Sequence, residues 1–208
     1  VLGEYNLAGS FRSPGILADP TGHLSEVQRV VAENFAKRRW VRARCEQAME
    51  KARSGFPLRK QAPFHDQVIA WLFPAGVLTH VVLVAALKNP TVRKRYAAAR
   101  EVLAEYGRLD AYETLLELLG SARLTSTQVQ GHLDAMTAAF DAAKAAIRSP
   151  FFFAADISDE ARPVAVDGSQ ELIDQGLHRE AVFWIVATYS RCMAVFEADG
   201  PPEMVERF

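Results

Sequence analysis

Twenty consecutive residues, 68–87, carry no formal charge. A helix of this length and composition must be buried, either in a membrane or among neighbouring helices that cover it on all sides. Pro74, Gly76, Thr79 and His80 lie inside the run, and no second uncharged run accompanies it. We therefore predict a central helix over about residues 63–87, kinked near Pro74, in a protein without a membrane segment.

Helical periodicity accounts for most of the remaining chain. Apolar residues recur at three- and four-residue steps, and glycines and prolines mark the segment ends. The expected helices cover about residues 25–53, 63–87, 90–106, 110–119, 126–148, 169–175 and 177–198. The clearest stripe is Val129, Leu133, Met136, Phe140, Ala143 and Ile147. These patterns predict an all-α protein, a bundle of six to seven helices over residues 25–208.

The first 24 residues interrupt this pattern with frequent glycine and proline. We expect an irregular N-terminal segment over residues 1–24, with a short strand at residues 15–18 as one option. Such a segment could be the remnant of a preceding α/β domain. The first long helix is expected to end at Gly55 and Pro57.

Composition argues against several classes of function. The 208 residues include 24 Lys and Arg against 25 Asp and Glu, a net charge of −1, so we expect no nucleic-acid partner. Basic residues cluster at 37–53 and 93–100, which predicts solvated helix faces or contacts with phosphate or an acidic partner. Cys45 and Cys192 lack disulfide or zinc spacing, which fits a cytoplasmic location. The chain begins at Val1 without a signal pattern, and it could be part of a longer polypeptide.

The segment 178–198 is expected to form a long helix with two distinct faces. Its apolar stripe consists of Val182, Ile185, Val186, Tyr189, Met193 and Phe196. A second face carries Glu180, Trp184, Thr188 and Arg191. This second face could line a pocket, or it could be a partly exposed surface with an intrahelical charge pair.

Catalytic and metal-binding patterns are weak. Gly9-Ser10 resembles the turn that opens a nucleotidyltransferase site, but that site needs a following Asp-x-Asp or Asp-x-Glu pair to hold Mg²⁺. The next acid is Asp19, followed by Pro20, so we predict no catalytic residues and no metal site in this chain. His65 and His80 are expected to be core histidines, or alternatively the acid–base groups of an independent enzyme if they open to a cleft.

Several blocks together resemble a known class of protein. They are residues 16–22 (ILADPTG), 71–77 (WLFPAGV), 89–96 (NPTVRKRY), 149–153 (SPFFF) and 178–184 (HREAVFW). Over roughly residues 16–198 the chain resembles the helical C-terminal half of bacterial nucleotidyltransferase-like proteins, similar to aminoglycoside nucleotidyltransferases. In such proteins a catalytic α/β domain precedes a helical bundle that covers the acceptor and often completes a dimer. That catalytic domain is absent from this sequence.

The resemblance implies a substrate-binding or dimerising domain that is inactive alone. Mg²⁺ and a nucleoside triphosphate are implied for a full-length enzyme, and none is expected to bind this chain by itself. The expected partners are a small-molecule acceptor and either a second copy or a catalytic domain.

Seven residues are the predicted substrate-binding set. Glu180 would meet a cationic acceptor, while Arg179, Arg93 and Arg95 would meet phosphate oxygens. Trp184, Arg191 and His80 complete the set, with a purely core role as the alternative for Trp184.

A stand-alone protein–protein interaction module is the main alternative function. A concave, polar-lined cavity near Glu180 and Trp184 would favour a substrate domain, and a flat apolar patch there would favour a partner interface.

Overall fold

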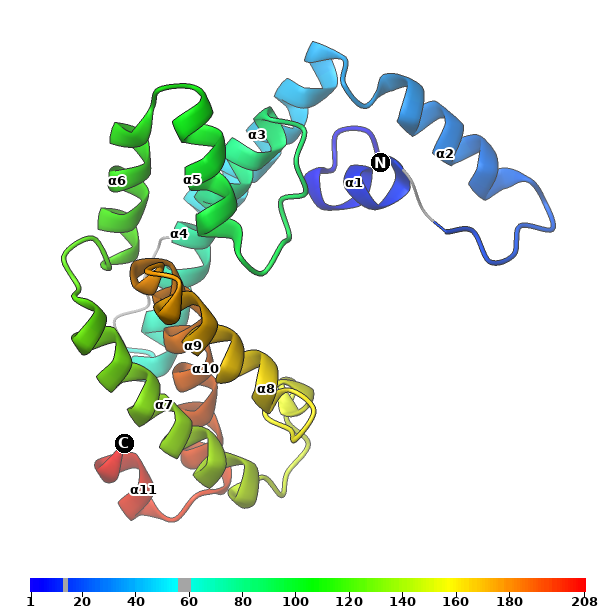
Figure 1. The fold of residues 1–208 in the computed structure, drawn as a ribbon. Coiled ribbons are helices and arrows are strands. Elements are labelled where there is room, and N and C mark those ends of the chain that lie inside the picture. Colours follow the sequence, from blue (N-terminus) through cyan, green and yellow to red (C-terminus); the bar gives the residue numbers. More distant parts are fainter. Residues whose placement is uncertain (13–14, 56–60) are drawn as a thin grey trace. The chain divides into compact units, whose positions relative to one another are not determined.

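The computed structural model describes residues 1–12, 15–55 and 61–208, and Pro57 therefore lies outside the described residues. Over these ranges the chain is helical and contains no strand, so the all-α prediction is confirmed (Figure 1). It forms more helices than the six to seven predicted. The helix expected over residues 25–53 is divided in two, and short helices form outside the expected segments at Tyr5–Arg12, Arg162–Ala165 and Pro202–Arg207.

The chain forms two compact units, and the boundaries at residues 73–74 and 115–116 fall inside helices. Unit 1 comprises Val1–Phe56 and Pro74–Leu115, and unit 2 comprises Pro57–Phe73 and Leu116–Phe208. The helices of unit 1 are α1 (Tyr5–Arg12), α2 (His23–Asn34), α3 (Arg38–Gly55), the second part of α4 (Phe64–Ala85), α5 (Arg95–Glu105) and most of α6 (Leu109–Leu119). Unit 2 holds the first part of α4, the end of α6, α7 (Ser126–Ala146), the 3-10 turn Ala154–Asp156, α8 (Arg162–Ala165), α9 (Asp167–Asp174), α10 (His178–Asp199) and α11 (Pro202–Arg207).

The N-terminal segment differs from the prediction. Residues 5–12 form α1, and residues 15–18 are neither strand nor helix. The backbone N–H of Tyr5 donates to Gln47 Oε1 of α3 at 2.8 Å, which satisfies a free donor in the first turn of α1. Tyr5 and Ala8 are buried in unit 1. Packing against α3 thus stabilises a helix that Gly3 and Gly9 obscure in the sequence.

The helix expected over residues 25–53 is broken at residues 35–37 into α2 and α3. Arg44, 1% exposed, donates from Nη2 to the Phe35 carbonyl oxygen at 2.6 Å and from Nη1 to the Leu2 carbonyl oxygen at 3.0 Å. The break releases the Phe35 carbonyl from the helical pattern, and a distant guanidinium satisfies it. The spacing of apolar residues along the sequence gives no sign of such a contact between distant residues.

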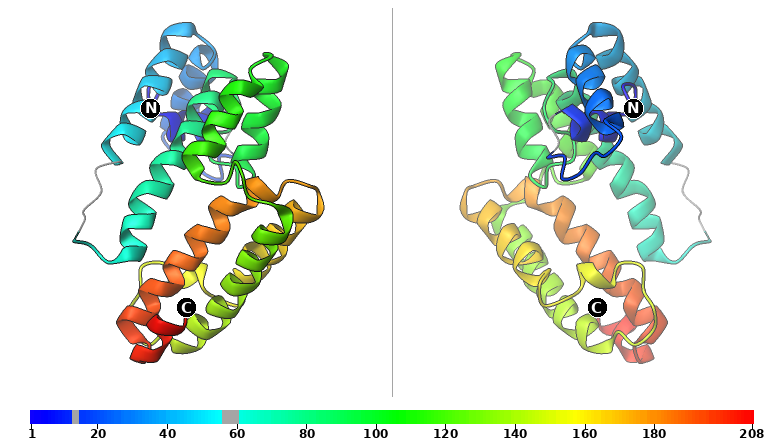
Figure 2. Two further views of the ribbon diagram at one scale, coloured as in Figure 1. Left: turned by 90° about the vertical axis from the view of Figure 1, so that its left-hand side faces the viewer. Right: turned by 90° about the vertical axis from the view of Figure 1, so that its right-hand side faces the viewer.

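Unit 2 is organised around α10, which runs alongside α7 and also contacts α9 and α11 (Figure 2). The α7 stripe is buried from Val129 to Ala143, as its periodicity predicts. Thr125 caps α7 because its hydroxyl accepts the Gln128 N–H at 3.3 Å while Gln128 Oε1 accepts the Thr125 N–H at 2.9 Å. This pairing sets the start of a helix that borders the cavity described below.

The uncharged run is helical, and α4 spans most of it with Pro74 inside. By length and composition, α4 and α10 could each cross a membrane, with mean hydropathies of 2.1 and 1.3. About half of each apolar window, 50% and 56%, is buried within the protein. Burial of this kind is common in core helices of globular proteins, so the two helices are weak evidence for a membrane.

Candidate functional site

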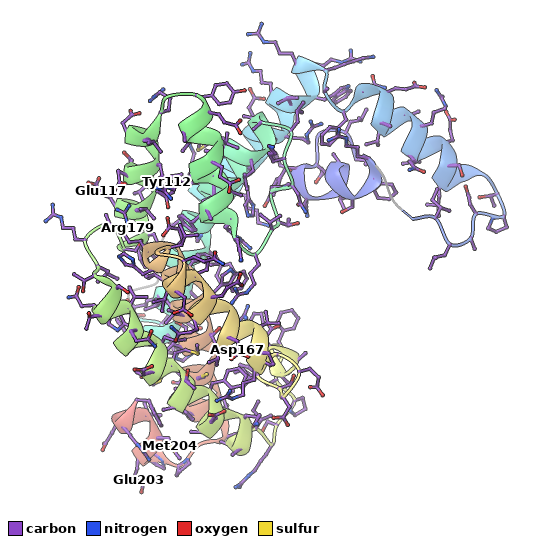
Figure 3. The ribbon with its side chains drawn as sticks, in the orientation of Figure 1. Tyr112, Glu117, Asp167, Arg179, Glu203 and Met204 are labelled. Atoms are coloured by element: carbon purple, nitrogen blue, oxygen red, sulfur yellow. The ribbon has the colours of Figure 1, made fainter. Side chains whose placement is uncertain are left out.

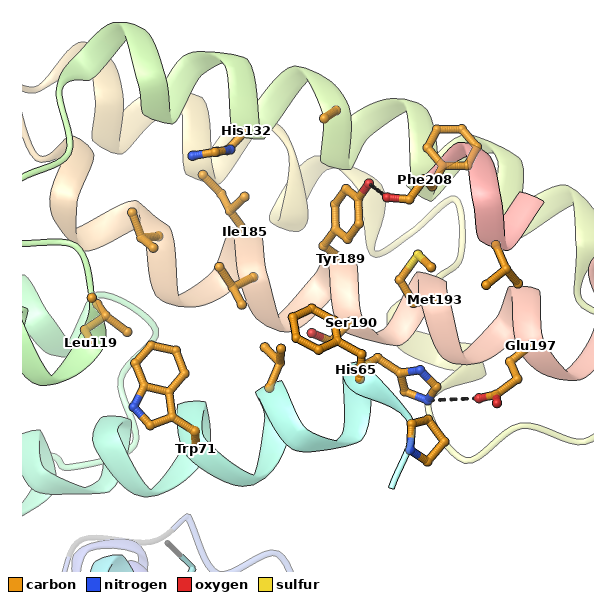
Figure 4. A pocket seen from close by; sticks show the side chains of 18 of the residues that line it. His65, Trp71, Leu119, His132, Ile185, Tyr189, Ser190, Met193, Glu197 and Phe208 are labelled. Atoms are coloured by element: carbon orange, nitrogen blue, oxygen red, sulfur yellow. Dashed lines mark hydrogen bonds and ion pairs between the residues drawn. The ribbon is translucent and has the colours of Figure 1, made fainter. Parts of the chain in front are cut away.

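Unit 2 contains a cavity of about 640 Å³ (Figure 4). Its walls come from the first turns of α4, the end of α6 and the loop that follows, α7, α10 and α11. All of these residues belong to unit 2. A volume of this size lies within the range of small-molecule sites, about 300–1,000 Å³.

The floor of the cavity is the apolar stripe of α10. It consists of Val182, Ile185, Val186, Tyr189 and Met193. The spacing of these residues places them on one helical face, as the sequence predicts. Phe196 shares the stripe but packs on Phe208, with stacked rings whose centroids are 5.3 Å apart. The stripe therefore serves as a cavity wall as well as a core surface.

Trp71 and Leu119 form the wall at one end (Figure 4). Directly after Leu119 the chain turns at Gly120, whose φ of +81° suits glycine and ends α6. A Cβ on Gly120 would lie 3.3 Å from the Trp71 ring. The glycine therefore permits both the turn and the close approach of the indole.

The opposite end of the cavity is polar. His65 Nε2 lies 3.5 Å from Glu197 Oε2 and 3.6 Å from Asp66 Oδ1. The His65 side chain is 13% exposed, whereas the Glu197 side chain is 54% exposed and lies at the rim. Ser190, 5% exposed, adds a hydroxyl to the lining, and His132 adds a second imidazole beside Ile185, away from His65 and Glu197 (Figure 4).

Helix α11 closes one side of the cavity through Val205, and the following Phe208 joins the same wall. The Tyr189 hydroxyl donates to the Phe208 carbonyl oxygen at 2.5 Å. No residue of α11 itself is buried. This hydrogen bond and the Phe196–Phe208 stack are therefore the main described contacts that hold the segment over the cavity.

The four predicted site residues on α10 lie outside the cavity lining. Arg179, in the first turn (Figure 3), donates from Nη1 to the Ala122 carbonyl oxygen at 3.3 Å. Glu180 is 6% exposed, and Trp184 packs edge-on against Phe183 at 5.1 Å. These three positions contribute to packing within unit 2.

Arg191 holds the connection between α7 and α8. Its Nη1 lies 3.1 Å from Asp156 Oδ2, and its guanidinium lies 4.6 Å from the centre of the Phe153 ring. The ion pair and the cation–π contact fasten residues 153–156 to α10.

The remaining predicted residues belong to unit 1. His80 Nε2 lies 3.1 Å from Arg95 Nη1, so the structure brings these two together, while Arg93 is half-buried before α5. Desolvation, with smaller contributions from Arg95 and Lys51, lowers the pKa of His80 from 6.5 to about 3. His80 is therefore neutral at pH 7, and at 5% exposure it does not open to a cleft.

The sequence predicts the site on the other face of α10. The apolar stripe of α10 follows from its periodicity, but Trp71, Leu119 and His132 show no local pattern that distinguishes a cavity wall from a core or a surface. His65, considered only as a core or catalytic histidine, does open to the cavity. In the parts of the chain that the structure covers, no group of three or more His, Cys, Asp or Glu side chains is arranged to hold a metal ion.

Comparisons with models of protein families, with curated protein sequences and with solved structures found no match to this chain. The interpretation of the site therefore rests on the chemistry of its own residues.

Proposed function

We propose that unit 2 is a binding domain for a small, largely apolar organic molecule. The observation that carries the proposal is the 640 Å³ cavity, which has aliphatic and aromatic walls and a few polar groups, among them His65 and Glu197 at one end (Figure 4). This combination is typical of small-molecule sites. Filling the cavity would remove the apolar surface that its walls still expose from water, which favours binding by about 25 cal/mol per Å² of buried apolar surface.

The size of the cavity suits a small molecule, because its volume of about 640 Å³ lies within the range of small-molecule sites, about 300–1,000 Å³. Val182 and Glu197, at opposite ends of the α10 wall, are fifteen residues apart, a distance of about 22 Å along the helix. A stand-alone protein–protein interaction module is the alternative function.

The nucleotidyltransferase hypothesis gives this binding domain a biological setting. If the resemblance holds, the bound molecule is the acceptor, and a separate catalytic domain supplies Mg²⁺ and the nucleotide. The acceptor would contact the stripe of α10 in place of Glu180 and Arg179. Dimerisation and a cytoplasmic location remain predictions of the same hypothesis.

A cavity-filling substitution tests the proposal. Ala135 lies on α7, is exposed and lines the cavity, so Ala135→Trp should place an indole in the cavity at little cost to folding. We expect this variant to bind the apolar dye Nile red at least about tenfold more weakly than the unchanged protein, by fluorescence titration.

Ala138→Trp is the matched control, because Ala138 is exposed on the same helix and is not part of the cavity lining. It should bind the dye as the unchanged protein does, and circular dichroism should show equal helicity for all three proteins. Equal dye affinity of Ala135→Trp and Ala138→Trp would mean that the cavity is not the binding site.

A further inference from the structure

We infer that the occupant of the cavity is an amphipathic amine, with its apolar body along α10 and its ammonium group at Glu197 and His65. This inference rests on the proposed function and adds the chemical class of the ligand. It is carried by the charge of the lining and by the position of the polar groups along α10.

Among the described residues that line the cavity, Glu197 is the only Asp or Glu, and none is Lys or Arg. The two histidines of this lining are His65 and His132. Asp66, beside His65, adds a second carboxylate at the same end. A cationic head group is attracted by both carboxylates, whereas a carboxylate or phosphate head would be repelled by them and would find no Lys or Arg among the described lining residues to pair with.

The carboxylate of Glu197 and the imidazole of His65 lie together at one end of the cavity. His65 and Glu197 lie at the end opposite Trp71 and Leu119 (Figure 4). Around Trp71 the lining offers aliphatic and aromatic surface, where a charged group would lose its hydration without compensation. A ligand with one charged end and an apolar body fits this distribution, while a polar molecule such as a multiply charged amino sugar would leave charges against apolar walls.

His65 lies at the centre of the proposed site for the ammonium head group. Its Nε2 lies within 3.6 Å of both carboxylates, which places the imidazole between Asp66 and Glu197. An ammonium group has three N–H donors and at this end of the cavity can donate to a carboxylate oxygen of Glu197. Its other donors face the solvent at the rim, where the Glu197 side chain is 54% exposed.

Three probes with the same ten-carbon chain test the inference on the full chain. Decylammonium, decanol and decanoate would each compete with Nile red at concentrations below aggregation. We expect decylammonium to displace the dye most readily and decanoate least, with at least about a tenfold difference between these two. The difference should shrink as salt is raised, because the head group lies at the exposed rim.

The variant Glu197→Gln separates charge from shape. It should weaken decylammonium binding several-fold and leave decanol binding unchanged. Glu203→Gln, on α11 (Figure 3), removes an exposed carboxylate that is not part of the lining, and it should change neither affinity.

The outcomes distinguish the two proposals. Equal displacement by all three probes, or stronger displacement by decanoate, would overturn the amine assignment and leave the binding function intact. Absence of dye and probe binding in the folded protein would overturn the binding function itself.

Discussion

Arg44 is the least exposed charged side chain among the described residues. Its guanidinium satisfies two backbone carbonyl oxygens and lies 4.3 Å from the centre of the Phe35 ring, while burial lowers its pKa. The charge is tolerated because its hydrogen bonds replace those with water. One side chain thereby ties the N-terminal segment to the break between α2 and α3.

We expect Arg44→Met to lower the free energy of unfolding by about 2–4 kcal/mol, because the Leu2 and Phe35 carbonyl oxygens lose their partner. Urea unfolding monitored by circular dichroism would measure the loss. Arg42→Met in the same helix removes an exposed guanidinium paired with Glu46 and should leave the unfolding midpoint unchanged. Equal stability of the Arg44 and Arg42 variants would contradict this assignment.

At the scale of the element, α11 is the weakest part of the cavity wall. It has six residues, none buried, and depends on contacts made by Tyr189 and Phe208. Short helices gain little stability from their own hydrogen bonds, so these tertiary contacts decide whether α11 stays in place.

Tyr189→Phe removes the hydroxyl that donates to Phe208. We expect faster hydrogen exchange of the backbone amides in α11, by a factor corresponding to about 1 kcal/mol of lost local stability. Tyr106→Phe provides the control, because Tyr106 is 71% exposed and belongs to unit 1. Unchanged exchange in α11 of the Tyr189 variant would show that the hydrogen bond does not hold this wall.

At the scale of the whole molecule, His80 makes stability depend on pH. In the folded chain its pKa is about 3, whereas in the unfolded chain it is near 6.5. Above pH 6.5 the His80 imidazole is neutral in both the folded and the unfolded chain. Its titration therefore takes nothing from the free energy of unfolding in this range. Between pH 6.5 and 3 only the unfolded chain takes up the proton, so acid favours unfolding.

Replacing this histidine should remove that dependence. Between pH 7 and 5 we expect the unchanged protein to lose about 2 kcal/mol more stability than His80→Gln. Urea unfolding of both proteins at a series of pH values would measure the difference. Parallel stability curves for the two proteins would show that His80 is not held neutral by the fold.

Local periodicity explains why the fold class could be predicted and the site could not. The stripes of α7 and α10 follow from residues three and four apart, so both appear in the sequence. The break after Asn34 depends on Arg44, and the cavity depends on Trp71, which meets Gly120 from a distant part of the chain. The spacing of apolar residues also distinguishes two faces of α10, but it does not show which of the two lines the cavity.

Because Trp71 lines the cavity, its intrinsic fluorescence can be used to follow what the cavity contains. The chain has three tryptophans, and Trp40 and Trp184 are not among the described residues that line the cavity. With both replaced by phenylalanine, ultraviolet emission would come from one indole in the cavity wall. Its wavelength would shift toward blue when an apolar molecule displaces water beside the ring, so occupancy of the cavity could be followed without any added label.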